Sequence, residues 1–311
     1  MFRSIILLAC LASNFASDVE YKSEFNQSEV ILNAVNYTDG NNDIKLLNVS
    51  TVLVTGANRG IGLEFIRQLA LLEPKISHII ATSKANNNVH ILKLDVTDYN
   101  SFDAFYAEVE KIVGESGLDI LINNAGILIR TSVDEVTPEE FMKNFEVNAV
   151  GPYMLARKLT PLIKVSQRKL IVAISSTAGS IEGADASYGG FPAYRASKSI
   201  FPYQILSLNY AIGSSDGRCE SGWCLVRENI SLWIVKKAAL NIITRTYGDH
   251  VKKDGIISVM FFPGVVKTDL GGPDAPLETA DSVVSMIKTI STLNAENNGC
   301  FIDYEGKTVP W

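Results

Sequence analysis

The sequence has few of the residues that bind metal ions or form disulfide frameworks. Of its 311 residues, four are cysteine and three are histidine. These residues are scattered along the chain, at Cys10, His78, His90, Cys219, Cys224, His250 and Cys300. Their spacing matches neither a zinc site nor a dense set of disulfides, so we expect no metal and no disulfide framework.

A basic excess is also missing. The formal net charge is −6, so no surplus of lysine and arginine can neutralise phosphates and we expect no nucleic-acid partner. Long hydrophobic runs are lacking too, since the apolar run at residues 5–12 is too short to cross a bilayer, and we expect no integral membrane span. Hydrophobic residues at 47% and charged residues at 20% are typical of a globular chain, long enough for one large α/β domain.

The first 49 residues differ from the rest. Residues 1–17 resemble a secretion signal, with Arg3 ahead of the apolar run and small residues after it. An apolar start without a targeting function explains them equally well. Residues 18–49 are polar and rich in asparagine, and we expect a disordered leader. It holds glycosylation-type triplets at Asn26, Asn36 and Asn48, which support secretion weakly.

From residue 50 onward, short β-branched runs alternate with helical patterns. We expect strands at residues 51–55, 78–82, 90–94, 119–123, 170–175, 255–262 and 299–303. We expect helices at residues 63–72, 102–113, 138–163 with an interruption near 151–152, and 280–290. This alternation predicts a single α/β domain over residues 50–311, a doubly wound parallel sheet of the Rossmann type.

A glycine-rich turn follows the first of these strands. Gly56, Gly60 and Gly62 stand between the strand and a helix. Glycines there let the backbone approach a pyrophosphate, and the helix N-terminus offers free N–H groups to it. The turn therefore predicts a dinucleotide site.

The sequence also indicates which dinucleotide. An NAD site usually carries an acidic residue at the end of the second strand, and residues 76–94 contain none. Lys84 lies in this stretch and Arg59 inside the turn. Two cations without a carboxylate favour a ribose 2′-phosphate, so we predict NADP(H), unless both are solvated surface charges.

A second group of polar residues indicates catalysis. Tyr194 and Lys198 share one helical face at i and i+4. Ser176 lies at the end of an expected strand, where open α/β sheets place their chemistry. The run Asn123-Asn-Ala-Gly126 ends another strand, and Asn148 lies in the helical region after it.

With these motifs, residues 51–311 resemble the short-chain dehydrogenase/reductase family. Asp95 after the third strand and Pro263-Gly264 with Thr268 belong to the same pattern. Gly179-Ser-Ile181, Thr268-Asp-Leu-Gly-Gly272 and the ending Gly306-Lys-Thr-Val-Pro-Trp311 are similar to the C-factor/sniffer-type carbonyl reductases.

The resemblance implies a role for each residue. Tyr194 would donate a proton to the carbonyl oxygen, Lys198 and the cofactor's positive ring would lower the pKa of that phenol, and Ser176 would bind the carbonyl oxygen. Asn148 would hold a water that links Lys198 to solvent. Asp95 would contact the adenine, and Asn124 the ribose. The cofactor-binding residues would be Gly56, Asn58, Arg59, Gly60, Ile61, Gly62, Lys84, Asp95, Val96, Asn124, Ala125, Gly126, Tyr194, Lys198, Val265 and Thr268.

The chain departs from the family in two places. Residues 199–237 intervene after the catalytic lysine, where the family's helix runs on, and Ala238-Ala-Leu-Asn241 resumes its pattern. Without this insertion, Leu240, Ile243, Tyr247 and Val251 continue one apolar stripe. The insertion resembles translated intron, although a lid over the substrate cleft is an alternative. The second departure is a crossover at residues 83–89 too short for the usual helix, which weakens the argument from Lys84.

These observations predict an NADPH-dependent reductase of small aldehydes or ketones. The alternative is an inactive nucleotide- or partner-binding protein, because the insertion cuts the helix that holds Lys198. We expect a small carbonyl compound as the partner, and the sequence leaves the oligomeric state open. The family resemblance favours the cytoplasm, whereas the N-terminus favours the secretory route.

Overall fold

The computed structural model of the chain describes residues 6–10, 47, 49–72, 75–76, 78–79, 89–180, 191–198 and 240–310, with 6–10 and 78–79 described by their backbone. Their centre is an eight-stranded sheet in the order β1-β4-β3-β2-β5-β6-β7-β8, in which every pairing is parallel. The strands are β1 (Ile6–Cys10), β2 (Thr51–Thr55), β3 (His78–Ile79), β4 (Val89–Lys93), β5 (Ile120–Asn123), β6 (Leu170–Ile174), β7 (Ile257–Phe262) and β8 (Phe301–Asp303). The predicted doubly wound parallel sheet is confirmed.

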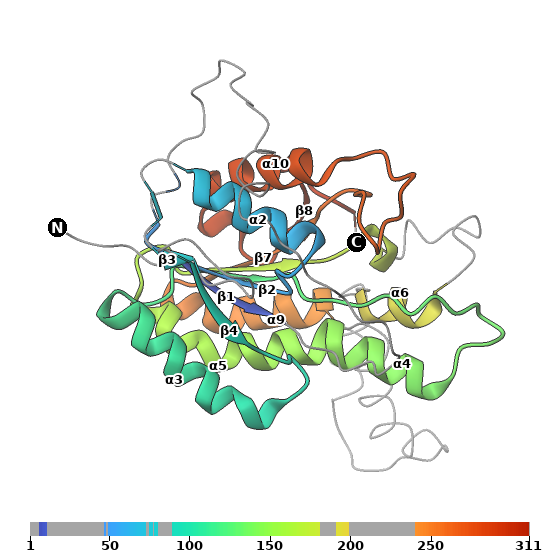
Figure 1. Cartoon of the computed structure of the whole chain (residues 1–311), viewed down its shortest axis with the longest axis horizontal. Helices are drawn as coiled ribbons and strands as arrows, with labels where there is room; N and C mark the ends of the chain where they lie inside the picture. The colour runs from blue at the N-terminus through green and yellow to red at the C-terminus, as the bar shows by residue number, and fades with distance from the viewer. Residues whose placement is uncertain are drawn as a thin grey trace, which may run out of the picture.

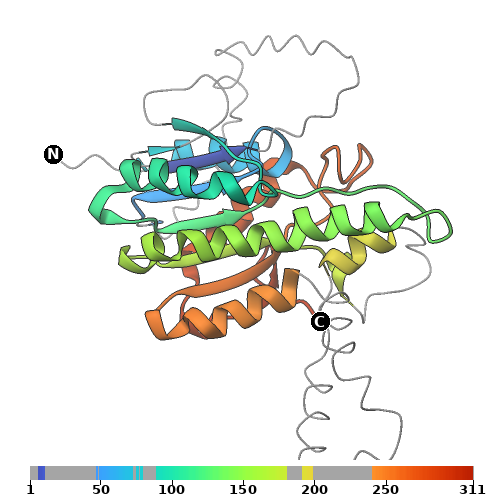
Figure 2. The same ribbon diagram turned by 90° about the horizontal axis from the view of Figure 1, so that it is seen from below.

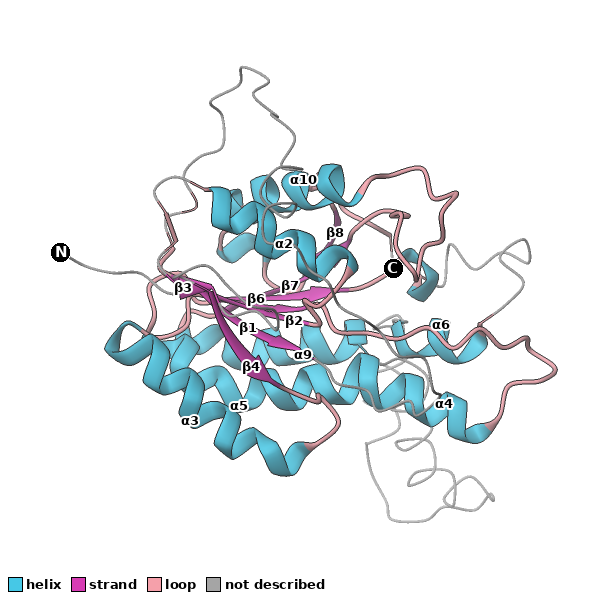
Figure 3. Ribbon diagram, viewed as in Figure 1, coloured by secondary structure: helices cyan, strands magenta, loops and turns pink. Residues whose placement is uncertain are grey.

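Helices cover both faces of the sheet. The described α-helices are α2 (Gly60–Leu71), α3 (Phe102–Val113), α4 (Pro138–Phe145), α5 (Gly151–Val165), α6 (Pro192–Lys198), α9 (Leu240–Val251) and α10 (Thr279–Thr292). The short helices are η1 (Tyr99–Ser101), η2 (Gly114–Ser116), η3 (Glu146–Val150), η4 (Thr177–Gly179), η6 (Lys252–Asp254) and η7 (Ala295–Asn297). In Figure 1, α2 and α10 lie above the sheet, and α3, α5 and α9 lie below it. Figure 3 shows the strands as a single layer between them.

The central strands are apolar on both faces because helices cover both. All residues of β2, β5 and β6 are buried. Helix α2 buries Phe65, Ile66 and Leu69 against this layer, and burial of such side chains contributes about 1.5–3 kcal/mol each. The apolar runs in the sequence therefore mark the central strands of the sheet. The loops that follow these strands meet at one edge of the sheet.

The helical region after β5 is interrupted by a π-helix. Helix α4 begins with a capping box, in which Thr137 and Glu140 each accept a bond from the other's backbone N–H. The π-helix η3 joins α4 to α5, and Figure 2 shows them as one nearly continuous rod. The interruption predicted near residues 151–152 thus lies just before them. Gly151 lets the start of α5 pack closely against Val96, because a Cβ on Gly151 would lie 2.6 Å from the Val96 carbonyl oxygen.

The second departure from the family concerns the crossover between β3 and β4. Strand β3 has two residues, which pair with Thr51 and Val52 of β2. Strand β1 also pairs with β2, through Leu7, Leu8 and Ala9, at the β2 residues that follow Val52. Strand β1 pairs with β4 as well. The expected strand at 78–82 is thus shorter among the described residues, and residues 80–88, with the short crossover and Lys84, lie outside them.

The insertion also lies outside the described residues. Helix α6 is described as far as Lys198, and α9 begins at Leu240. Leu240, Tyr247 and Val251 are buried and Ile243 is partly buried, which confirms the predicted stripe. Among the described helices, none combines the length and apolar character that a bilayer crossing needs.

Candidate active site

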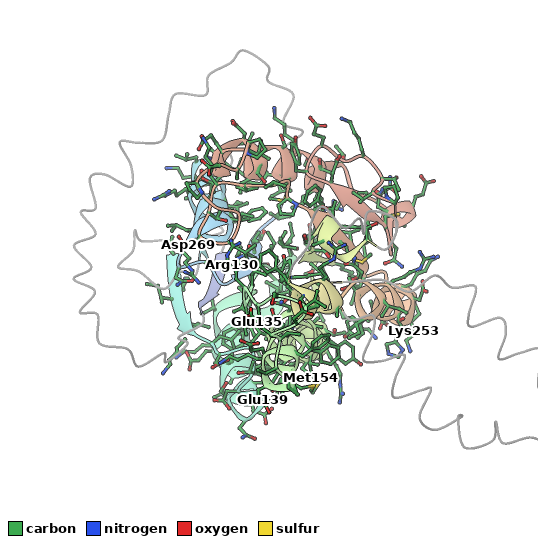
Figure 4. The ribbon with its side chains drawn as sticks, turned by 90° about the vertical axis from the view of Figure 1, so that its right-hand side faces the viewer. Arg130, Glu135, Glu139, Met154, Lys253 and Asp269 are labelled. Carbon is green, nitrogen blue, oxygen red and sulfur yellow. The ribbon has the colours of Figure 1, made fainter. Side chains whose placement is uncertain are left out.

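The predicted site residues gather at one edge of the sheet. The glycine turn follows β2, Asn124 follows β5, Ser176 follows β6 and Pro263 follows β7. Because all these strands are parallel, their carboxyl ends meet at the same edge. Figure 4 looks toward this side of the molecule and labels Arg130 and Asp269 on it.

The glycines of the turn are required by close contacts. Gly56 and Gly60 have φ of +63° and +53°, a region that favours glycine. A Cβ on Gly62 would lie 2.4 Å from the Gly56 carbonyl oxygen and 2.5 Å from Nδ2 of Asn124. A Cβ on Gly56 would lie 2.8 Å from Cα of Ala125. The turn is thus packed directly against the end of β5.

The N-terminus of α2 suits an anion. Arg59 is its N-cap residue, with extended backbone and no side-chain cap bond, and the first turn carries no acidic residue. The uncapped N–H groups and the positive end of the helix dipole then face the turn. Together with the close glycine backbone, this arrangement fits the pyrophosphate of a dinucleotide.

Asn124 locks the turn in place, a role that sequence reasoning missed. Its Nδ2 donates to the carbonyl oxygens of Thr55, at 2.8 Å, and Gly56, at 3.1 Å. The backbone N–H groups of Asn124 and Ala125 donate to Oγ1 of Thr55. The predicted contact of Asn124 with the ribose stays a prediction. The signal for the observed role was the Asn-Asn-Ala-Gly run, which stands opposite the turn.

Some of the other residues predicted to contact the nucleotide make hydrogen bonds within the protein. Oδ1 of Asp95 accepts from the backbone N–H of Thr97, at 2.9 Å, and from its hydroxyl, at 2.7 Å. Val96 is buried. At the tip of the turn, Asn58 and Arg59 are exposed, as a nucleotide ligand requires. Contacts of these residues with a nucleotide stay predictions.

Tyr194 and Lys198 lie together on α6 and are buried to 8% and 5% exposure. The Tyr194 hydroxyl is hydrogen-bonded to Ser176. Lys198 donates through Nζ to the carbonyl oxygen of Ile174, at 3.1 Å, at the end of β6. A Cβ on Gly126 would lie 3.7 Å from the same Nζ. The structure therefore brings the predicted serine, tyrosine and lysine together.

Asn148 lies in the π-helix and joins two elements of the site. Its Oδ1 accepts from the backbone N–H of Ile127, at 2.8 Å, and its Nδ2 donates to the Ile127 carbonyl and to Oγ of Ser197, each at 2.9 Å. The π-helix turns this side chain between the end of β5 and α6. Its predicted hold on a water stays a prediction, since these bonds engage the side chain within the protein.

Burial controls the protonation of Tyr194 and Lys198. It lowers the pKa of Lys198 to about 7. Burial also raises the pKa of Tyr194, against a smaller lowering by the hydrogen bond from Ser176. The phenol therefore keeps its proton at neutral pH, while Lys198 titrates near neutrality. In the protein alone, burial thus dominates and raises the pKa of Tyr194, and its expected lowering by Lys198 and the cofactor's positive ring stays a prediction.

Ser175 and Asn241 form a buried bond that sequence reasoning missed. Oγ of Ser175 donates to Oδ1 of Asn241 at 2.5 Å. This bond holds the start of α9 against the end of β6, beside Ser176. The only sequence signal was the resumed Ala-Ala-Leu-Asn pattern after the insertion.

The loop after β7 closes over the glycine turn. A Cβ on Gly60 would lie 3.3 Å from Cγ2 of Thr268. Arg130 donates through Nη2 to the Leu270 carbonyl at 2.8 Å, and its guanidinium lies 5.4 Å from the centre of the Phe191 ring. Thr268 is thus beside the turn, and Val265 is exposed. The predicted contacts of both residues with the cofactor stay predictions. No pattern in the sequence indicated that Arg130 binds the Leu270 carbonyl.

Comparisons with known proteins show the family to which the chain is similar. The sequence profile of the short chain dehydrogenase family matches residues 50–202. C-signal of Myxococcus xanthus is 30% identical over 195 residues, which are 62% of this chain and 93% of that protein. The solved carbonyl reductase Sniffer of D. melanogaster is 30% identical, with a TM-score of 0.67, over 84% of this chain and 98% of that one. The NADPH-bound carbonyl reductase from chicken fatty liver is also 30% identical, with a TM-score of 0.66, over 84% and 93%.

Proposed function

This chain belongs to the short-chain dehydrogenase family, and we propose that it is an NADPH-dependent reductase of small aldehydes or ketones. The observation that carries the proposal is the cluster of Ser176, Tyr194 and Lys198 beside the glycine turn. A buried phenol with a hydrogen-bonding hydroxyl partner and an amine of shifted pKa is a combination typical of proton-transfer sites.

The cofactor proposal rests on the residues of the turn. Gly56, Gly60 and Gly62 with the uncapped start of α2 fit a pyrophosphate. Arg59 projects from the same turn and offers a charge-assisted contact to a ribose 2′-phosphate. The similar carbonyl reductase from chicken fatty liver, solved with NADPH, supports this choice. The cofactor supplies the hydride that reduces the carbonyl carbon.

The chain's own residues supply the proton and hold the substrate. Tyr194 donates its hydroxyl proton to the carbonyl oxygen as the alcohol forms, and its raised pKa ensures that the proton is present. Ser176 donates a hydrogen bond to the same oxygen. Lys198, with a pKa of about 7, can take up and release a proton at neutral pH, which suits restoration of the Tyr194 proton.

Loss of the Tyr194 hydroxyl tests the proposal. In the full-length protein, Tyr194→Phe is expected to lower NADPH-dependent reduction of small aldehydes and ketones by about 100-fold or more, because proton donation contributes at least that factor. The Kd of NADPH should change little. Tyr106→Phe is the matched control, since its hydroxyl bonds Glu110 on α3, away from the site. Undiminished turnover in Tyr194→Phe would contradict the assigned role.

A second candidate function is nucleotide or partner binding without catalysis. The feature that favours it is the sequence of the insertion, residues 199–237, which follows Lys198 directly. Tight NADPH binding by the wild-type chain with no turnover of any tested carbonyl would support this candidate and contradict the reductase.

A further inference from the structure

Arg59 has a partner in the structure that a dinucleotide site does not explain. Its Nη1 lies 2.7 Å from Oδ2 of Asp269, on the loop after β7. The side chains are 68% and 76% exposed. The residue that we assign to the 2′-phosphate is therefore already paired with a carboxylate in the protein alone.

We propose that Asp269 is a cofactor-affinity residue, which holds Arg59 in the protein alone and competes with the 2′-phosphate of NADPH for it. This inference rests on the proposed function. A carboxylate and a phosphate on one guanidinium either exchange or remain as two neighbouring anions. Both cases oppose NADPH and leave NADH, which has no 2′-phosphate, unaffected.

The exposure of the pair indicates the size of the effect. An ion pair in water is weak, so a dianionic phosphate can displace the carboxylate. The competition should weaken NADPH binding by no more than about five-fold. Asp269 therefore tunes the affinity for NADPH without preventing binding.

The loop itself does not depend on this pair. Arg130 holds the Leu270 carbonyl, Thr268 packs beside Gly60, and the Thr268 hydroxyl accepts from the backbone N–H of Gly271 at 3.0 Å. The loop backbone thus keeps these contacts when Asp269 is neutralised. Asp269→Asn is then a change of charge with little change of structure.

The test compares the Kd of NADPH and of NADH by fluorescence titration at one ionic strength, with the full chain. Asp269→Asn should tighten NADPH binding several-fold, up to about five-fold, and leave the Kd of NADH unchanged. In an Arg59→Met background, the same substitution should tighten NADPH binding less, because competition for Arg59 is removed. Asp274→Asn is the matched control, an exposed aspartate on the same loop.

Three results would overturn the inference. NADPH binding could be unchanged or weaker in Asp269→Asn, which would make Asp269 neutral or a support for Arg59. Both cofactors could tighten equally, or Asp274→Asn could match Asp269→Asn, which would indicate a general effect of charge. Failure of the wild-type chain to bind NADPH would instead contradict the proposed function.

Discussion

Lys198 shows how one buried residue connects stability with function. Its ammonium would lose hydration in the site, and burial lowers its pKa to about 7. Nζ retains a hydrogen bond to the Ile174 carbonyl, which orients the group beside Tyr194. A lysine that titrates near neutrality suits proton exchange, but its burial disfavours the charged form in the folded state.

The pH dependence of stability tests this account of Lys198. Between about pH 7 and 10.4 the unfolded chain keeps the lysine proton and the folded chain releases it, so stability should rise with pH across that window. The melting temperature of the protein without cofactor, relative to Lys198→Met, should therefore increase by several degrees from about pH 7 to about pH 10. The exposed Lys111→Met should follow the wild type. A constant difference between wild type and Lys198→Met would contradict the assigned pKa.

Helix α6 directly precedes the insertion in the sequence. This helix carries Tyr194 and Lys198. Helices gain most of their stability from packing, and the Ser175–Asn241 bond anchors the start of α9 beyond the insertion. Pro202 in the insertion cannot continue a helix without the loss of a backbone hydrogen bond, so a direct junction of Lys198 to Ala238 should add backbone hydrogen bonds beside Lys198.

Removal of the insertion is expected to improve the protein. Joining Lys198 to Ala238 by deletion of residues 199–237 should raise both the melting temperature and the rate of NADPH-dependent reduction. The continuous helix would hold Tyr194 and Lys198 more firmly, and small misplacements of such groups cost about 100-fold in rate. Thermal unfolding and steady-state assays of both chains measure this. A deletion that melts lower and turns over more slowly would identify the segment as a lid or support.

At the scale of the whole molecule, the N-terminus bears on location. Strand β1 pairs with both β2 and β4. Cleavage of a signal near Ser17 would remove β1 and its hydrogen bonds to these two strands, which is unfavourable in a sheet. We therefore propose that the segment is retained and that the protein is cytoplasmic, with the secretory route as the alternative.

Analysis of the native protein decides between the two locations. N-terminal sequencing should find the segment before Ser17 intact, and glycosidase treatment should leave the mass unchanged. A new N-terminus near Ser17, together with a glycan at Asn26, Asn36 or Asn48, would establish the secretory route instead.

The sequence by itself determined the order of the elements and the location of the chemistry. The β-branched run in β2 and the apolar run in β6 predicted buried parallel strands, because a strand between two helix layers has no solvent face. The glycine turn and the Tyr/Lys pair were equally legible, since each depends on residues a few positions apart. The family resemblance then assigned roles to them.

Only the tertiary structure decided which distant residues meet. Arg59 and Asp269 are 210 positions apart, and Arg130 meets Leu270 across another long separation. Burial at the end of β6 determines the pKa of Lys198, and only the sheet shows that β1 pairs with β2 and β4. Local patterns specify strands and helices, whereas contacts between loops and the polarity around a side chain arise when those elements pack together.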